Sequence, residues 1–137
     1  MVTAMYVEIN GKWEHAIGIW PNGDFSGKPC GFIPLGGLSH FWEALGVRED
    51  AEEKLQPEWI KGNLVPVAPE YPVLSWLIQM QIDNSWVKAE DIPALLREVD
   101  IGRANCIDPQ GMAVFEALKT CATLALAQSN GIALSPF

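Results

Sequence analysis

The sequence has no long apolar runs and no clustered cysteines. No apolar segment approaches the roughly 18 residues that a membrane-spanning helix needs. Residues 1–11 show no basic stretch followed by an apolar segment and a small-residue cleavage site, so no secretory signal is expected. Cys30, Cys106 and Cys121 are widely spaced, unlike a disulfide framework. These absences predict a cytoplasmic protein with reduced thiols and no membrane contact.

Basic residues are also scarce. The chain has nine Lys and Arg against 17 Asp and Glu, which gives a formal net charge of −8. Nucleic-acid phosphates are bound mainly through Lys and Arg. Because no basic stripe with interleaved aromatic residues is present, nucleic-acid binding is not expected. The acidity favours solubility, and it would also attract a basic partner; both interpretations stay open.

Sequence signatures of catalysis and metal binding are missing. Residues 21–37 are rich in glycine but contain neither phosphate-loop pattern. Ser39 and His40 are adjacent, and adjacent helix positions do not face each other, so a capping serine beside an exposed histidine is expected rather than a catalytic pair. Cys30, His40 and Asp24 lack the close-pair spacing of metal ligands. We therefore expect a protein that is not an enzyme and has no catalytic residue, no metal and no cofactor.

The chain does contain enough apolar material for one core. Its 137 residues are 49% apolar and 19% charged, which fits one globular domain over residues 1–137. A chain of this length buries roughly two-thirds of its unfolded surface, so it needs no disulfide or metal to fold.

Strand-forming segments occur at both ends of the chain. Residues 5–20 form two β-rich runs around Asn10-Gly11, the preferred pair for a hairpin turn in which both central residues have positive φ. Short strands are predicted in "GFIPL" (31–35) and "GIALSPF" (131–137). Residues 73–82, "VLSWLIQMQI", suit either a strand or a buried helix, and we favour a strand because polar and apolar residues alternate at its end.

Helices are predicted in three places. Within residues 38–47, Ser39 is the expected N-cap, and Gly46 is expected to end the helix in the left-handed conformation. A second helix begins near residues 89–91, because Pro93 belongs in a first turn. Its apolar stripe has the spacing i, i+3, i+4 and i+7; the residues are Ile92, Leu95, Leu96 and Val99.

The longest predicted helix closes the chain. Asp108 caps it, Pro109 takes its first position, and it runs to about Gln128 before Asn130-Gly131. Only one narrow stripe of this helix is polar, so it should be mostly buried, with Cys121 as a small core side chain. Together these elements predict an α+β fold: a small antiparallel sheet, opened by an N-terminal β-hairpin, packed against two or three helices including a long buried C-terminal helix.

Six tryptophans and one acidic segment are the candidate binding features. Aromatic residues dominate interface hot spots as well as small cores. We expect Trp42 and Trp76 to be mostly buried and Trp59 to be exposed, although packing could account for all six. The candidate partner-binding residues lie in one stretch: Glu49, Asp50, Glu52, Glu53, Glu58 and Trp59.

From residue 71 onward, the segments "YPVLSWLIQMQIDNSWVKAEDIPALLREV", "CIDPQG" and "FEALKTCATLALAQSNGIAL" follow an ordered pattern. The pattern is aromatic-Pro-x-Leu, a turn ending in Trp, a helix with an acidic start, an Asp-x-x-Gly step, and a long helix before Gly-Ile. It resembles a family of small bacterial proteins classed as predicted immunity proteins of polymorphic-toxin systems. The matching positions are Tyr71, Pro72, Leu74, Asp83, Trp86, Glu98, Asp108, Gly111, Gly131 and Ile132.

The chain departs from this family in the turn before Trp86. The family has Asp-x-Asp-Gly-Glu-Trp there, whereas this chain has Gln81, Asn84 and Ser85 in place of the first acid, the glycine and the glutamate. "GGLSHFWEAL" looks like the family's Gly-x-Tyr-x-x-Phe helix entry.

The resemblance implies an α+β fold and a binding function without turnover. An immunity protein occludes a cognate toxin, and an acidic one would complement a basic nuclease. Asp83, Trp86, Asp108 and Gly111 would then shape structural turns, and Trp86 would hold its helix against the sheet.

Other interpretations remain open. A small-molecule-binding module or an uncharacterised enzyme could use the 21–37 loop and the tryptophans as a pocket, which a concave site holding His15 or His40 beside polar groups would indicate. A structural subunit would present a large apolar symmetric interface. Monomer and homodimer are both compatible with the sequence.

Overall fold

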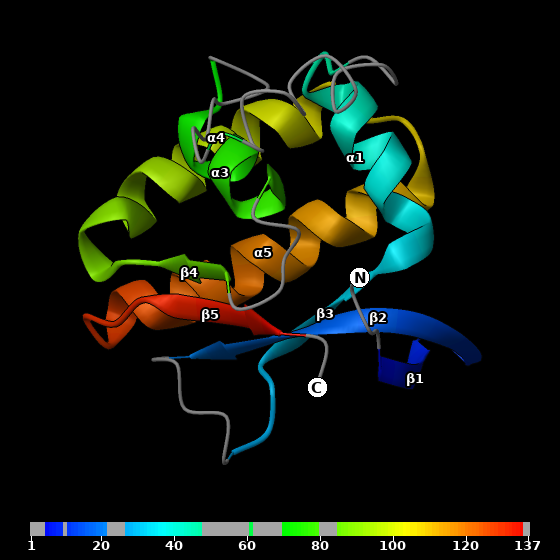
Figure 1. Ribbon diagram of the computed structural model, residues 1–137, viewed down its shortest axis with the longest axis horizontal. Coiled ribbons are helices and arrows are strands. Elements are labelled where there is room, and N and C mark those ends of the chain that lie inside the picture. Colours follow the sequence, from blue (N-terminus) through cyan, green and yellow to red (C-terminus); the bar gives the residue numbers. More distant parts are fainter. Residues whose placement is uncertain are drawn as a thin grey trace.

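The computed structural model describes residues 5–9, 11–21, 27–47, 61, 70–79 and 85–135. The predicted α+β fold is confirmed: the helices lie on one face of an antiparallel sheet, giving two layers (Figure 1). The strands are β1 (Met5–Ile9), β2 (Lys12–Pro21), β3 (Gly31–Pro34), β4 (Ser85–Val87) and β5 (Ile132–Ser135). The α-helices are α1 (Leu38–Ala44), α3 (Pro72–Gln79), α4 (Ile92–Ala104) and α5 (Pro109–Ala127). Two 3-10 turns, η1 (Leu35–Gly37) and η2 (Ala89–Asp91), precede α1 and α4.

The predicted N-terminal hairpin is present, and Gly11 has the positive φ expected of its turn. Ile9 pairs with Lys12, and Gly11 has a φ of +82°, which glycine adopts without steric penalty. The predicted strands near residues 31–35 and 131–137 are present as β3 and β5. β2 pairs with β1, β3 and β5, while β5 lies between β2 and β4. The two ends of the chain therefore meet in one sheet.

Residues 72–79 form the helix α3, so the strand favoured for residues 73–82 is wrong over its described part. The carboxylate of Glu98, on α4, lies at the first turn of α3. Its Oε1 accepts from the backbone N–H of Leu74 at 3.1 Å, and its Oε2 accepts from that of Val73 at 3.3 Å. These bonds satisfy N–H groups that the start of a helix leaves without partners. Because Glu98 is 24 residues away from Leu74, local periodicity gave no sign of this cap.

The start of α1 differs from the prediction, and its end matches. Ser39 is not the N-cap: Gly37 occupies that position, and Ser39 lies exposed in the first turn. The turn η1 leads directly into α1, and the backbone N–H of Leu38 donates to the carbonyl of Leu35. This carbonyl therefore accepts from one of the N–H groups at the helix start that a capping side chain would otherwise satisfy. Gly46, with a φ of +78°, follows the helix as expected.

The helices α4 and α5 supply most of the core. Of the predicted stripe on α4, Ile92, Leu95 and Val99 are fully buried, and Leu96 is partly buried against the core. On α5, the side chains of Phe115, Leu118 and the predicted core residue Cys121 are fully buried; Phe115 packs on Phe41 of α1, with their ring centroids 4.7 Å apart. No helix in the described ranges is long and apolar enough to cross a membrane.

The tryptophans are distributed differently from expectation. Trp86 is 49% exposed and lies outside the core cluster, while the alternation of β4 points Val87 into the core. The role expected of Trp86 in holding the helix against the sheet stays a prediction. Among the described tryptophan side chains, Trp20 is the buried one, and its indole N–H donates to the carbonyl of Gly27 at 3.0 Å. Trp42 is partly buried against the core. Trp59 and the side chain of Trp76 lie outside the described residues.

Candidate functional site

The predicted partner-binding segment cannot be placed, because Glu49, Asp50, Glu52, Glu53, Glu58 and Trp59 all lie outside the described residues, as does Asp83. Asp108 and Gly111 are described, and both lie at the start of α5. They adjoin a pocket that the sequence did not reveal.

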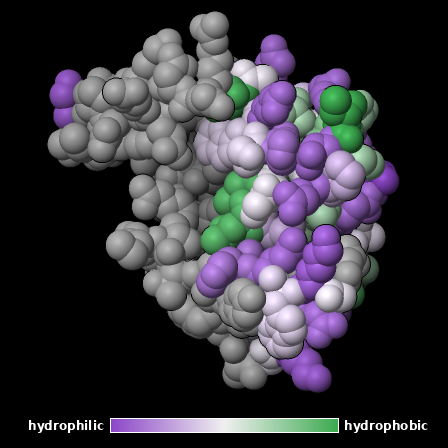
Figure 2. Space-filling view, turned by 90° about the vertical axis from the view of Figure 1, so that its right-hand side faces the viewer, coloured by the Kyte–Doolittle hydropathy of each residue, from purple (hydrophilic) through white to green (hydrophobic). Residues whose placement is uncertain are grey.

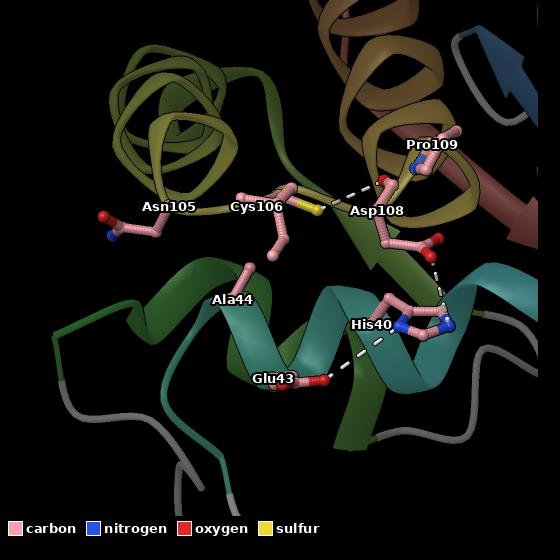
Figure 3. A pocket seen from close by; sticks show the side chains of 8 residues that line it. His40, Glu43, Ala44, Asn105, Cys106, Asp108 and Pro109 are labelled. Atoms are coloured by element: carbon pink, nitrogen blue, oxygen red, sulfur yellow. Dashed lines mark hydrogen bonds and ion pairs between the residues drawn. The ribbon is translucent and has the colours of Figure 1, made fainter.

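The pocket lies between α1 and the connection from α4 to α5 (Figure 3). Its volume is about 510 Å³, and its lining consists of His40, Glu43 and Ala44 from α1 together with residues 105–109. Among the described residues, no tryptophan and no residue of the 21–37 loop lines it. His15, the other histidine considered, lies exposed on β2 and does not contribute.

Asp108 links the start of α5 to α1. Its Oδ1 accepts hydrogen bonds from the backbone N–H of Gln110 at 2.8 Å and of Gly111 at 3.2 Å, so the predicted N-cap is confirmed. Its Oδ2 lies 3.6 Å from Nε2 of His40. One carboxylate thus caps the start of α5 and also lies beside the imidazole of His40 on the neighbouring helix α1 (Figure 3).

His40 lies between two carboxylates. Its Nδ1 is 4.0 Å from Oε2 of Glu43, one helical turn further along α1. The His40 side chain is 39% exposed and that of Glu43 is 82% exposed, so the pocket opens to solvent on the Glu43 side. The histidine was correctly expected to be accessible. Its pairing with Asp108 was missed, because 68 residues separate the two positions and no local pattern connects them.

Gly111 allows α1 and α5 to approach each other. A Cβ atom on Gly111 would lie 2.8 Å from Sγ of Cys106 and 2.8 Å from Cβ of His40, closer than real Cβ contacts permit. Cys106 therefore lies near His40, yet its thiol points toward the backbone carbonyl of Asp108, 3.6 Å away (Figure 3). A nucleophilic site needs its thiol directed at a base, and this thiol is directed elsewhere. No group of three or more His, Cys, Asp or Glu side chains in the described part is placed to hold a metal ion.

The rim of the pocket carries an exposed apolar residue. Ile107, between Cys106 and Asp108, is 96% exposed. Figure 2 views the molecule from the side of α1 and shows a described surface that is mainly hydrophilic, with a few apolar residues among the polar ones. The arrangement combines an apolar projection with the carboxylates of Glu43 and Asp108, which suits a ligand carrying both an apolar and a basic group.

Comparison with known proteins found no matching family model, no matching curated protein and no matching solved structure. The function must therefore be inferred from the geometry of the pocket, the surface charge and the motifs of the sequence.

Proposed function

We propose that the chain is a non-enzymatic protein-binding protein, and that a basic partner binds the face formed by α1 and the α4–α5 connection. The observation that carries this proposal is the 96% exposure of Ile107 beside the carboxylates of Glu43 and Asp108. An apolar anchor surrounded by polar groups is the usual organisation of an interface hot spot.

The position of Ile107 distinguishes it from an ordinary exposed apolar residue. Single exposed apolar residues are common on protein surfaces. Ile107, however, lies on a short connection whose two ends are held by the packed helices α4 and α5, and the next residue is fixed as the N-cap of α5. Because this connection is already ordered, binding would lose little conformational entropy there.

The charge of the molecule selects the kind of partner. With a net charge of −8, the chain attracts basic proteins at long range, and Glu43 and Asp108 supply negative charge at the pocket itself. The predicted acidic segment begins only six positions after Glu43 in the sequence. The motif resemblance to predicted immunity proteins agrees with this picture, in which the chain would occlude a basic toxin.

Binding measurements on matched variants test the proposal. The partner is sought by purifying complexes from the source cells and by co-expressing any toxin encoded beside this gene, and the dissociation constant is then measured by calorimetry. Glu43→Lys and Ile107→Ala should each weaken binding at least tenfold, which corresponds to about 1.4 kcal/mol. Two control variants should leave the dissociation constant unchanged. Glu90→Lys makes an equal charge change in η2, at the end of α4 opposite the pocket, and Ile101→Ala truncates another exposed isoleucine outside the pocket. Equal binding by all four variants would refute the assignment of this face.

A second candidate function is small-molecule binding, which the pocket itself favours. It is concave and holds His40 beside the polar groups of Glu43, Asn105 and Asp108, the arrangement that characterises ligand sites. Native mass spectrometry of the purified protein distinguishes the two candidates. A bound small molecule that is lost in His40→Ala but kept in Ile107→Ala would establish this second function in place of the first.

A further inference from the structure

The pocket beside Asp108 lies where two helices end. Its lining includes Glu43 and Ala44, the last two residues of α1, and Asn105, the C-cap of α4. The C-terminal end of a helix carries a partial negative charge, because its last carbonyl groups have no partner within the helix. The opposite charge at the start of α5 is offset by its N-cap, the carboxylate of Asp108. The helix ends around the pocket therefore favour a cation.

Several acceptors that line the pocket are not satisfied by the protein itself. Oδ1 of Asp108 accepts from two backbone N–H groups, whereas Oδ2 lies 3.6 Å from Nε2 of His40, which is too far for a hydrogen bond. No residue in the described ranges donates a hydrogen bond to Oδ2, to the carboxylate of Glu43 or to the side chain of Asn105. No described residue of the lining is Lys or Arg, and Arg103, two positions before Asn105, pairs with a glutamate on α5.

We infer that the pocket receives the guanidinium group of an arginine side chain from the basic partner. In this assignment, which rests on the proposed function, the carboxylates of Glu43 and Asp108 hold the charged end of the arginine. Its aliphatic part lies along the exposed side chain of Ile107 at the rim.

The arrangement of the acceptors suits arginine better than lysine. A guanidinium group is a planar fork with five N–H donors, whereas the ammonium group of lysine is a compact point charge. The acceptors of the pocket come from α1 through Glu43 and from the α4–α5 connection through Asn105 and Asp108, so a fork reaches both elements at once. The imidazole of His40 lies between the two carboxylates and offers a planar ring on which a guanidinium group stacks.

The pocket also has the space and the apolar surface for the rest of the side chain. Its volume of about 510 Å³ exceeds that of an arginine side chain, and Ala44, Cys106 and Pro109 add apolar surface to the lining. Long charged side chains bury their methylene groups on such surface. The side chains of His40 and Asp108 are only 39% and 34% exposed, so solvent screens a charge there less than on an open surface.

A titration with model compounds tests the inference without the partner. The probe is Nα-acetyl-arginine methylamide, which carries one guanidinium group and no other charge, and its binding to the full chain is followed by NMR of the backbone amides. The signals of Asn105, Cys106 and Ile107 should shift saturably. The citrulline compound, which has the same shape without the charge, should bind roughly tenfold more weakly or less. The lysine compound should bind more weakly than the arginine compound.

Matched variants locate the binding groups. Glu43→Gln and Asp108→Asn should each lower the affinity for the arginine compound roughly fivefold or more, and Glu90→Gln, the same change at the other end of α4, should not. If Asp108→Asn fails to fold, the exposed Glu43 decides through its own variant. No saturable shift, equal binding of the arginine and citrulline compounds, or full affinity in both pocket variants would each overturn the inference.

The failure of this inference is distinguishable from the failure of the proposed function. If Glu43→Lys and Ile107→Ala weaken partner binding while the arginine compound does not bind, the face is correct and arginine is not its anchor. If the partner binds all of these variants equally, the face itself is wrong, and so is the assignment of its arginine to the pocket. With the partner in hand, replacing its arginines at the contact by lysine should weaken the complex roughly tenfold; an unchanged dissociation constant would also overturn the inference.

Discussion

At the scale of single residues, two glycines determine how closely the elements approach each other. Gly111 allows α1 to contact α5 beside the pocket, and Gly131 lies against β4 where the chain enters β5. Gly131 does not have the left-handed conformation that often explains a glycine after a helix; Ser129, with a φ of 56°, has it instead. Gly131 is required because there is no space for a side chain.

Replacing Gly131 by alanine should therefore destabilise the protein. The added Cβ would overlap the backbone carbonyl oxygen of Val87, so β4 and β5 must move apart. Such overpacking costs about 1–3 kcal/mol, measurable as a lower urea midpoint. Gly27→Ala is the matched control, because nothing lies within 4 Å of its added Cβ. A Gly131→Ala variant as stable as Gly27→Ala would contradict this explanation.

Asp108 has two functions that substitutions can separate. Asp108→Ala removes the acceptor for the N–H groups of Gln110 and Gly111 and should cost about 0.5–2 kcal/mol. Asp108→Asn retains a good capping side chain and removes the charge beside His40, so its unfolding free energy should stay much closer to that of the wild type. Chemical denaturation measures both. Equal losses in the two variants would show that the charge, and not the cap, provides the stability.

At the scale of elements, the contact between α3 and α4 depends on one buried acid. Burial of Glu98 raises its carboxyl pKa, although the N–H groups of Leu74 and Val73 and the charge of Arg97 oppose this shift. The folded-state pKa thus exceeds that of the unfolded chain, about 4.3. The resulting contribution to stability is fully present below that value and is lost as the pH rises through the folded-state pKa.

Glu98→Gln removes this titration and gives a direct comparison. The unfolding free energy of the wild type minus that of Glu98→Gln should fall as the pH rises from about 4 to about 7. Urea denaturation of both proteins across this range measures the difference. Glutamine also loses one of the two acceptors for α3, but that loss does not depend on pH. A difference that stays flat, or that rises with pH, would show that the pKa of Glu98 is not raised.

Elements whose determinants are local were predicted from the sequence. Asn10-Gly11 specifies the hairpin, the stripe from Ile92 to Val99 specifies α4, and Asp108-Pro109 specifies the start of α5. The wrong N-cap at Ser39 has a local cause, because the carbonyl of Leu35 in η1 accepts from the N–H of Leu38. The wrong strand at residues 73–82 has a long-range cause, because Glu98 caps α3 from another helix. The pocket was not predicted from the sequence for the same reason: His40 and Asp108 become neighbours only when α1 packs on α5.

At the scale of the whole molecule, the C-terminal strand connects the parts of the fold. β5 pairs with β2 of the N-terminal hairpin on one side and with β4 on the other. Leu134 of this strand is fully buried in the core cluster, between the sheet and the helices. A defect at Leu134 should therefore affect the hairpin and the helices together.

Leu134→Ala should lower the stability of the entire fold in one transition. Truncating a fully buried leucine costs about 2–5 kcal/mol, whereas Leu126→Ala on α5, where the side chain is 47% exposed, should change stability by no more than about 0.5 kcal/mol. Urea unfolding followed by helical circular dichroism and by tryptophan fluorescence should give coincident curves for both variants, as expected of one cooperative domain. If Leu134→Ala separates the two curves, then the sheet and the helices unfold independently, and the prediction of a single domain over residues 1–137 is wrong.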